Sequence, residues 1–204
     1  MRAEFDVSSI AERLASVKVH GEAFPTLFRE LLRRLAAGHP VAPLSLAKAL
    51  DWPNQTVIET LAKAQGAEYD TQGNVVGYGL TLNETPHAFE VNGKRLFTWC
   101  ALDTLFFPAL LEMSARVSSH CAVTGAPVSI VVSPHEVRET TPTEAMLSLV
   151  QPDGAASIRG AFCRHVQFFV SRPAARQWAS ANPGTVLVSV LDAFRLGQDI
   201  ARRL

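Results

Sequence analysis

Apolar residues in the first third of the chain recur three or four positions apart, which is the period of an amphipathic helix. The clearest run begins near Pro25, a favourable first-turn residue, and ends at Gly38. Three further helices are predicted: one capped by Ser8 or Ser9 and running toward Lys18, one over Leu44–Leu50, and one that opens at Pro53. We expect the inward face of the last of these helices to consist of Val57, Ile58, Leu61 and Ala62.

A hairpin is predicted next, because the turn residues Asp70 to Asn74 separate two strand-like runs that end near Leu82. Helices followed by a helix–turn–helix and a hairpin are the pattern of a winged helix. A winged helix often binds DNA, but residues 48–68 carry two lysines against three acidic residues, too few cations to neutralise phosphates. We therefore interpret residues 1–82 as a degenerate winged-helix unit that serves as a scaffold.

Residues 83–204 have the pattern of a mixed α/β domain with a β-sheet core. Asn92-Gly93 is a strong signal for a tight hairpin between residues 88 and 98. Runs rich in β-branched and aromatic residues predict further strands over 128–133, 146–150, 162–171 and 186–190. Helices are predicted over Cys100–Leu111 (limited or kinked by Pro108), from Pro173 to Ala181, and over Leu191–Arg203. The predicted fold class is α+β, with a domain boundary between residues 82 and 83.

The balance of charges argues for a small-molecule partner. Lysine plus arginine equals aspartate plus glutamate at 19 each among 204 residues, so the formal net charge is zero. Such a chain lacks the field that draws proteins onto nucleic acid or anionic membranes. No run approaches the roughly 18 apolar residues that cross a bilayer, and the segment MRAEFDVSSI has no signal-like apolar run. We expect a cytoplasmic protein that binds neither nucleic acid nor membrane.

The chain has three cysteines, Cys100, Cys121 and Cys163, which are expected to be free thiols in a reducing compartment. They form no CxxC pair and have no closely spaced histidine, so a structural zinc site is not expected. Cys121 precedes a turn, and we interpret it as a structural thiol that supports the site. His120 beside it is interpreted as a hydrogen-bonding residue, not a catalyst. No partner can be identified from the sequence for His20, His39, His87 and His135.

The segment FTWCALDTLFFPALL, residues 97–111, carries the strongest candidate chemistry. If Thr98 caps a helix, Cys100 lies in its first turn, where backbone N–H groups favour a thiolate. Asp103 is three residues further on and would share a helix face with Cys100. A carboxyl group beside a thiolate among apolar neighbours should have a raised pKa, which suits a proton donor. The expected apolar walls are Trp99, Phe106 and Phe107, although spacing alone also fits a core cysteine and a surface aspartate.

Cys163 lies in GAFCRHVQFFVS, which we predict to be a strand. Alternation would place Cys163, His165 and Gln167 on one face and Phe162 on the other. A thiol among polar groups fits the wall of an active site better than a core position, so the alternation slightly favours a functional role.

At these residues the sequence resembles the organomercurial (alkylmercury) lyase family. The resemblance is carried by GNVVGYGLTL (73–82), WCALDTLFFPALL (99–111), ARVSSHCAVTGAPVS (115–129), FCRHVQFF (162–169) and WAS (178–180). It implies that Cys100 and Cys163 are the catalytic cysteines, Asp103 the catalytic aspartate and Cys121 a structural cysteine. It also implies a degenerate winged helix followed by a mixed α/β catalytic domain. Some members have a second cysteine after the strand cysteine, where this chain has Arg164.

The implied reaction is protonolysis of the carbon–mercury bond of alkyl- and arylmercury compounds, which gives a hydrocarbon and Hg(II). Mercury(II) is soft and prefers thiolates, so Cys100 and Cys163 would hold it, with Asp103 as a further ligand, while Asp103 transfers the proton. No cofactor is expected apart from external small thiols. The mercury would pass to small thiols or to a mercuric reductase, and we expect a monomer or weak homodimer.

Two alternatives stay open at this point. A thiol-based, metal-sensing winged-helix repressor would bind duplex DNA, which the neutral charge balance does not favour. A cysteine hydrolase would use Cys100 with His120 or His165 and needs an imidazole within reach of the thiol. The sequence contains no nucleophile motif for such a hydrolase, and that reading leaves Asp103 without a role.

Overall fold

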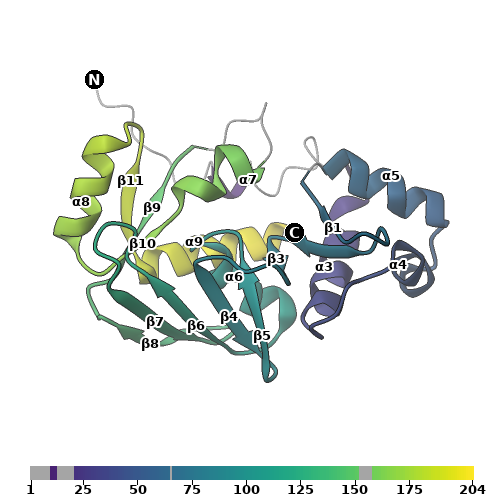
Figure 1. The fold of residues 1–204 in the computed structure, drawn as a ribbon, viewed down its shortest axis with the longest axis horizontal. Coiled ribbons are helices and arrows are strands. Elements are labelled where there is room, and N and C mark those ends of the chain that lie inside the picture. Colours follow the sequence, from purple (N-terminus) through teal and green to yellow (C-terminus); the bar gives the residue numbers. More distant parts are fainter. Residues whose placement is uncertain (1–9, 13–20, 65, 152–157) are drawn as a thin grey trace.

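The computed structural model describes residues 10–12, 21–64, 66–151 and 158–204 (Figure 1). The helix predicted between Ser8 and Lys18 lies almost wholly outside these residues. A helical unit, with the first strands of the larger sheet beside it, occupies one end of the molecule, and the rest of that sheet, a smaller sheet and their helices occupy the other. The predicted α+β class is therefore confirmed.

The N-terminal unit contains α3 (Phe24–Leu35), α4 (Pro43–Leu50) and α5 (Asn54–Ala64), as the apolar periodicity predicts. Helix α3 buries one continuous face, formed by Phe24, Leu27, Phe28, Leu31, Leu32 and Leu35. Gly38, where this helix was predicted to stop, has a φ of 81°, a left-handed conformation that favours glycine after a helix.

The predicted inward face of α5 is wrong in part. Val57 and Leu61 are buried, but Ile58 is 44% exposed, and Ala62 is also exposed. Thr60 is buried instead, and its hydroxyl donates to the carbonyl oxygen of Thr56 at 2.7 Å. Because this hydrogen bond satisfies the polar group inside the helix, a threonine can occupy the buried face that the apolar pattern assigned to other residues.

The larger sheet has eight strands in the order β1-β2-β3-β5-β4-β6-β7-β8, and every neighbouring pair is antiparallel. Its strands are β1 (Glu68–Tyr69), β2 (Val75–Tyr78), β3 (Leu80–Thr81), β4 (His87–Val91), β5 (Lys94–Thr98), β6 (Ala115–His120), β7 (Pro127–Val132) and β8 (Val137–Thr141). Both predicted hairpins are present, as β1–β2 and β4–β5. The sheet continues across the predicted boundary at residues 82 and 83, and that boundary stays a prediction.

Two strands of this sheet, β6 and β8, were not predicted. Strand β6 alternates buried and exposed residues, but its buried set includes a serine, Ser119, beside Ala115 and Val117. Strand β8 is an edge strand without a buried residue. Polar edge strands lack the apolar alternation by which strands are recognised in a sequence.

The smaller sheet is antiparallel, with β9 (Met146–Leu149) between β10 (Phe168–Phe169) and β11 (Val186–Ser189). The remaining helical elements are α6 (Asp103–Leu111), α7 (Ile158–Ala161), the 3₁₀ turn η1 (Cys163–His165), α8 (Arg172–Ala181) and α9 (Val190–Arg203). The predicted strands at 128–133, 146–150 and 186–190 and the helices near Pro173 and Leu191 are confirmed.

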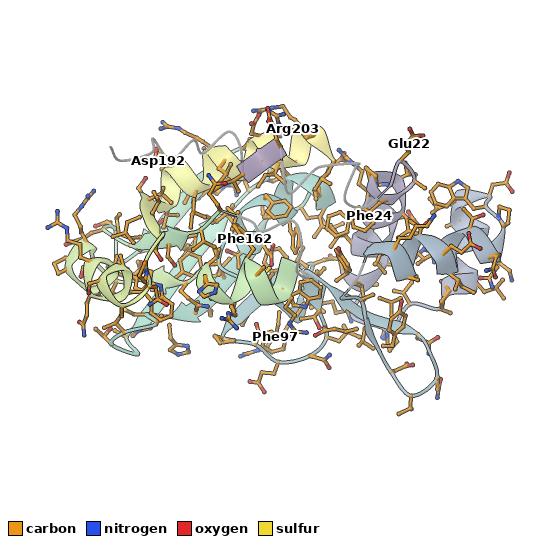
Figure 2. All side chains as sticks on the ribbon, turned by 90° about the horizontal axis from the view of Figure 1, so that it is seen from above. Glu22, Phe24, Phe97, Phe162, Asp192 and Arg203 are labelled. Carbon is orange, nitrogen blue, oxygen red and sulfur yellow. The ribbon has the colours of Figure 1, made fainter. Side chains whose placement is uncertain are left out.

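Helices α6 and α9 pack closely through a glycine. A Cβ atom on Gly197 would lie 2.8 Å from the Cβ of Phe106, so only glycine permits this approach. Figure 2 shows Phe162 in the interior of the molecule, whereas Glu22, Asp192 and Arg203 project at its periphery. In the described part of the chain, no helix combines the length and apolar character needed to span a bilayer.

Candidate active site

Cys100 and Asp103 come together at the start of α6, but not in the predicted way. Helix α6 begins at Asp103, and Cys100 lies in the turn before it, so the prediction that Thr98 caps the helix is wrong. The Thr98 hydroxyl instead donates to the carbonyl oxygen of Cys100 at 2.9 Å. The carboxylate of Asp103 reaches back and accepts the backbone N–H of Cys100 at 3.0 Å. The aspartate therefore fixes the turn that carries the thiol.

Cys163 is not on a strand, so the alternation used to interpret it was wrong. It begins η1, directly after α7, and only Phe168 and Phe169 of the predicted strand pair with a neighbour. The backbone N–H of Val166 donates to the carbonyl oxygen of Cys163 at 3.1 Å, which closes a tight turn. Both Cys163 and Phe162 are buried, at 2% exposure each, because a 3₁₀ turn does not separate adjacent side chains onto opposite faces.

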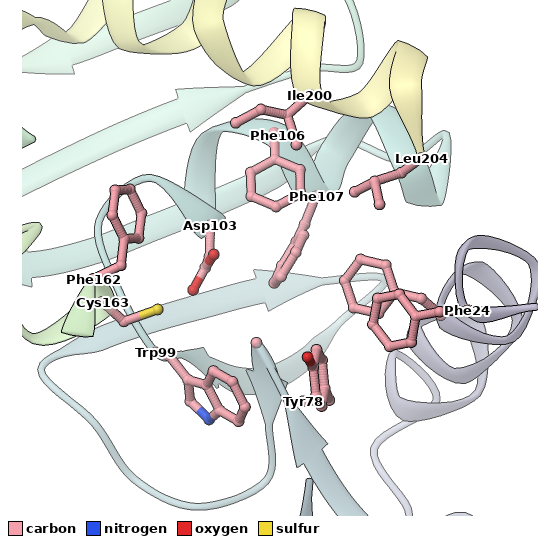
Figure 3. A pocket seen from close by; sticks show the side chains of 12 residues that line it. Phe24, Tyr78, Trp99, Asp103, Phe106, Phe107, Phe162, Cys163, Ile200 and Leu204 are labelled. Carbon is pink, nitrogen blue, oxygen red and sulfur yellow. The ribbon is translucent and has the colours of Figure 1, made fainter. Parts of the chain in front are cut away.

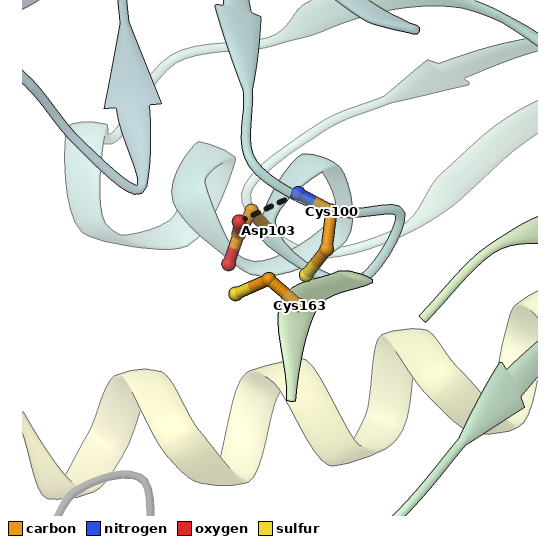
Figure 4. A group of neighbouring side chains, drawn as sticks. All are labelled: Cys100, Asp103 and Cys163. Carbon is orange, nitrogen blue, oxygen red and sulfur yellow. Dashed lines mark hydrogen bonds between the residues drawn. The ribbon is translucent and has the colours of Figure 1, made fainter. Parts of the chain in front are cut away.

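The structure brings Cys100, Asp103 and Cys163 into one cluster, as Figure 4 shows. The two sulfur atoms and a carboxylate oxygen all lie within 4.8 Å of one another. All three residues are buried, Asp103 being the most exposed at 7%. Two thiols and a carboxylate at this spacing form a donor set suited to a soft metal ion.

Burial keeps the protons on this cluster. It raises the pKa of Asp103 to about 7, against the hydrogen bonds from Cys100 and the Trp99 backbone, which lower it. Burial also raises the pKa of Cys100, helped by its hydrogen bond to Cys163 and the charge of Asp103. The predicted raised pKa of Asp103 is confirmed, but the predicted stabilisation of a Cys100 thiolate by the helix start is wrong.

The surroundings of Cys163 shift its pKa in opposite directions. The hydrogen bond from Cys100 lowers the pKa of Cys163, but burial and the charge of Asp103 raise it and prevail. The charge of Arg159, a residue on α7, acts in the lowering direction. A metal ion that binds here must therefore displace thiol protons, and Asp103, whose pKa lies near neutrality, is the nearby group that can take one up.

An apolar cavity of about 50 Å³ opens beside the cluster, and Asp103 and Cys163 form part of its lining. Figure 3 shows both side chains directed into it from one side. The predicted walls Trp99, Phe106 and Phe107 all line it, so that prediction is confirmed. These apolar walls lower the polarity of the surroundings of the thiol and the acid, which strengthens electrostatic interactions there.

Sequence reasoning missed the residues that connect the N-terminal unit to the site. Arg159 lies over the ring of Trp99, with its guanidinium carbon 5.2 Å from the ring centroid. It also forms an ion pair with Glu68 of β1, which accepts a hydrogen bond from the hydroxyl of Thr81. Glu68 and Arg159 are 91 positions apart, so no local pattern indicates their pairing.

Tyr78 is a further residue of the site that the sequence did not single out. Its ring lies 5.1 Å from that of Trp99, and its hydroxyl donates to the carbonyl oxygen of Ala64 at 3.0 Å. Burial raises the pKa of Tyr78, so the hydroxyl stays protonated and acts as a fixed donor.

Cys121 lies outside this cluster. It packs with Met146, Phe169, Ala174 and Ala175 in a separate small core beside β10. Its backbone N–H donates to the carbonyl oxygen of Ala126 at 2.8 Å, which closes the predicted turn. Its burial agrees with the structural interpretation, and its supporting role stays a prediction.

The histidines are not part of the thiol–carboxylate cluster in the described residues. His87, for which the sequence identified no partner, is buried, and its Nδ1 lies 2.8 Å from the Ser119 hydroxyl. Burial lowers the pKa of His87 to about 4, so it is neutral. The side chain of His165 lies against Arg164, whose Nε donates to its Nε2 at 2.9 Å. His120 is exposed, and the hydrolase alternative gains no support.

Two family models match this chain. The model described as alkylmercury lyase matches residues 80–202, and the model described as the helix-turn-helix domain of alkylmercury lyase matches residues 7–79.

Individual proteins are similar over nearly the whole chain. An alkylmercury lyase from Pseudomonas putida is 53% identical over 195 residues, 96% of this chain and 92% of that protein. One from Streptomyces lividans is 46% identical, covering 88% of this chain and 84% of that protein. A crystal structure described as the mercury-bound form of MerB2 has a TM-score of 0.83 at 25% identity, covering 96% of this chain and 98% of that one.

Proposed function

The chain belongs to the alkylmercury lyase family, and from this premise we propose that it cleaves the carbon–mercury bond of organomercurials by protonolysis. The observation that carries the proposal is the cluster of Cys100, Asp103 and Cys163, whose ligand atoms lie within 4.8 Å of one another. The alternative of a DNA-binding metal sensor is not favoured, because the family model that matches the helical unit is itself described as a domain of alkylmercury lyase.

The substrate is R–Hg–X, where X is a small thiolate. One protein thiol, Cys100 in this scheme, displaces X and forms R–Hg–S, and its proton leaves with X as the free thiol. Mercury(II) binds sulfur more strongly than oxygen, so the exchange keeps the metal on its preferred ligand. The buried position of Cys100 then holds the mercury beside Asp103 and Cys163.

The second step joins Cys163 to the metal and transfers its proton to carbon. The Cys163 thiol gives its proton to the Asp103 carboxylate as its sulfur bonds to mercury. Two sulfur ligands donate electron density to the metal and make the bound carbon more basic. Asp103 then protonates that carbon as the carbon–mercury bond breaks. The products are R–H and Hg(II) bound by two thiolates, with no change of oxidation state. A pKa of about 7 lets Asp103 both accept and donate the proton near neutrality.

External thiols complete the proposed cycle. They supply X, and in excess they can remove the product Hg(II) from the two cysteines by ligand exchange. A mercuric reductase is the other proposed acceptor of the metal. We propose that the enzyme requires no resident metal or organic cofactor and works in the cytoplasm as a monomer or weak homodimer.

The test is hydrocarbon release from methylmercury or phenylmercury in the presence of excess thiol. Cys100→Ser and Cys163→Ser should each abolish the release of methane or benzene, because each removes one of the two sulfur ligands. Cys121→Ser is the matched control and should keep turnover, since Cys121 lies outside the cluster. Full turnover by Cys163→Ser would contradict the two-thiol scheme.

A further inference from the structure

The turn that carries Cys163 is tied by hydrogen bonds on its C-terminal side. The carbonyl oxygen of Val166 accepts the backbone N–H of Ala101, in the turn of the other thiol, at 3.2 Å. The hydroxyl of Ser148 on β9 donates to the carbonyl oxygen of His165 at 2.7 Å. The end of η1 is therefore fixed both to the first thiol's turn and to the smaller sheet.

On the N-terminal side of Cys163, contacts of Arg159 hold α7. The guanidinium of Arg159 forms an ion pair with Glu68 of β1, and its central carbon lies 5.2 Å from the centroid of the Trp99 ring. Helix α7 continues almost directly into η1, because only Phe162 separates the two elements. A change in the position of Arg159 is therefore passed on to the sulfur four positions later in the chain.

The Glu68 carboxylate is the fixed partner of this ion pair. It accepts a hydrogen bond from the hydroxyl of Thr81 on β3, and it lies against β2 at Gly77, where a Cβ atom would collide with it. The side chain of Glu68 is 12% exposed, whereas that of Arg159 is 47% exposed. Because the carboxylate is held in the sheet, it determines where the more exposed arginine lies.

The Trp99 ring depends on packing for its orientation. Its indole N–H is buried and has no hydrogen-bond partner among the described residues, so the contacts with Arg159 and with the ring of Tyr78 set its position. Trp99 lines the cavity on the same side as Cys163 (Figure 3), and it directly precedes Cys100 in the chain. The arginine therefore contacts the wall beside one thiol and holds the helix that leads to the other.

We propose that Glu68 and Arg159 are a positioning pair, which places the Cys163 sulfur where it can bind mercury already held by the other cysteine. This inference rests on the proposed function. Neither residue of the pair touches the substrate, and both act through Cys163. Glu68 lies in the segment that matches the helix-turn-helix model and Arg159 in the segment that matches the lyase model. The pair thus gives the β1–β2 hairpin a role in assembling the site, in place of contact with DNA.

The experiment separates the two steps of a single turnover. Methylmercury is supplied as its complex with a chromophoric thiol, so that release of this thiol reports the first bond between mercury and the protein, and methane reports cleavage. Every protein tested carries Cys121→Ser, which leaves the paired thiols as the only cysteines. Arg159→Met removes the charge and the planar group, Arg159→Lys keeps the charge, and Glu68→Gln keeps the length of the partner side chain.

We expect Arg159→Met to slow methane release about tenfold to a hundredfold, because a reacting atom misplaced by about 1 Å can lose that much rate. Release of the chromophoric thiol should keep its rate, since the first cysteine is unchanged. Arg159→Lys should recover part of the loss. Glu68→Gln should slow methane release by a smaller factor, and the double variant should be no slower than Arg159→Met, because Glu68 acts through the arginine.

Arg34→Met is the control for loss of a partly exposed ion pair. Arg34 is 37% exposed and pairs with Glu30 at 2.7 Å, outside both the cluster and the cavity lining, so neither step should change. The inference would be overturned if Arg159→Met slowed both steps equally or left methane release unchanged, or if the two single losses multiplied in the double variant. Release of the chromophoric thiol without methane by the protein that keeps Glu68 and Arg159 would instead contradict the proposed function.

Discussion

Cys100 and Cys163 differ from Cys121 in their surroundings, although all three thiols are buried. At the paired thiols, burial and the charge of Asp103 raise the pKa of each sulfur. Burial also raises the pKa of Cys121, but hydrogen bonds from the Thr124 hydroxyl and from the backbone N–H groups of Thr124, Val170 and Val123 outweigh it, and the pKa is lowered. Cys121, whose thiol ionises most easily of the three, therefore lies outside the cluster.

The different pKa shifts of Cys121 and of the paired thiols indicate what the proposed reaction requires. A lowered pKa favours a nucleophilic thiolate, yet Cys121 belongs to no group of three or more potential metal ligands among the described residues. In the proposed mechanism the paired thiols, whose pKa values are raised, lose their protons as mercury binds, and Asp103 lies beside them to receive one. Because the organic group must leave mercury with a proton, the proposed reaction needs a cluster that holds protons, which a preformed thiolate does not supply.

Among variants that keep both Cys100 and Cys163, Asp103→Asn is expected to reduce activity most. An amide keeps the size of the side chain but cannot carry a proton to carbon, so turnover of methylmercury should fall by a factor of about 10² to 10⁴. Both thiols remain, so Hg(II) should still bind with one ion per protein. These quantities are measured by methane release and by titration of thiols after mercury binding. Loss of Hg(II) binding together with turnover would instead make Asp103 chiefly a ligand or a structural residue.

A second effect concerns stability and pH. The pKa of Asp103 is raised from 3.8 to about 7 on folding, so between these values the folded chain binds more protons than the unfolded chain. The contribution of Asp103 to stability therefore falls as pH rises through this window. Relative to the unmodified protein, Asp103→Asn should be more stable at pH 8 than at pH 4, by a difference on the order of a few kcal/mol. Denaturant unfolding at both pH values measures this difference, and equal differences at pH 4 and pH 8 would contradict it.

The smallest effect on activity is expected from Cys121→Ser. Replacing a buried sulfur by a hydroxyl in the small core with Met146 and Phe169 should reduce the free energy of unfolding by about 1–3 kcal/mol. The activity of the folded variant should stay close to that of the unmodified protein. Denaturant unfolding gives the first quantity and hydrocarbon release the second. A loss of turnover with unchanged stability would remove the distinction between Cys121 and the paired thiols.

Local patterns were sufficient to predict much of this molecule. The periodicity of α3 and the Asn92-Gly93 turn depend on neighbours in sequence, and both elements form as expected. The proximity of Cys100 and Asp103 was also predicted from their spacing. The actual cause differs. Cys100 lies before the helix, and its backbone N–H donates to the carboxylate of Asp103, the first residue of α6. The pairing with Cys163 was implied by the family resemblance and not by any local pattern.

The features that could not be predicted depend on contacts between distant segments. The turn at Cys163 follows from its packing after α7, where tertiary contacts override the strand propensity of its aromatic neighbours. The raised pKa of Cys100 is a consequence of complete burial, which a helix-start argument does not include. The approach of Phe24 to the site depends on how the helical unit packs against the sheets.

The most direct test of the two-thiol account is the sulfur coordination of the product mercury. Cys121→Ser leaves Cys100 and Cys163 as the only cysteines in the chain. After one turnover of methylmercury chloride without added thiol, X-ray absorption at the mercury edge reports the ligands of the bound ion. The account predicts two sulfur ligands per mercury and one methane released per ion. A single sulfur ligand on mercury that has already lost its methyl group would contradict it.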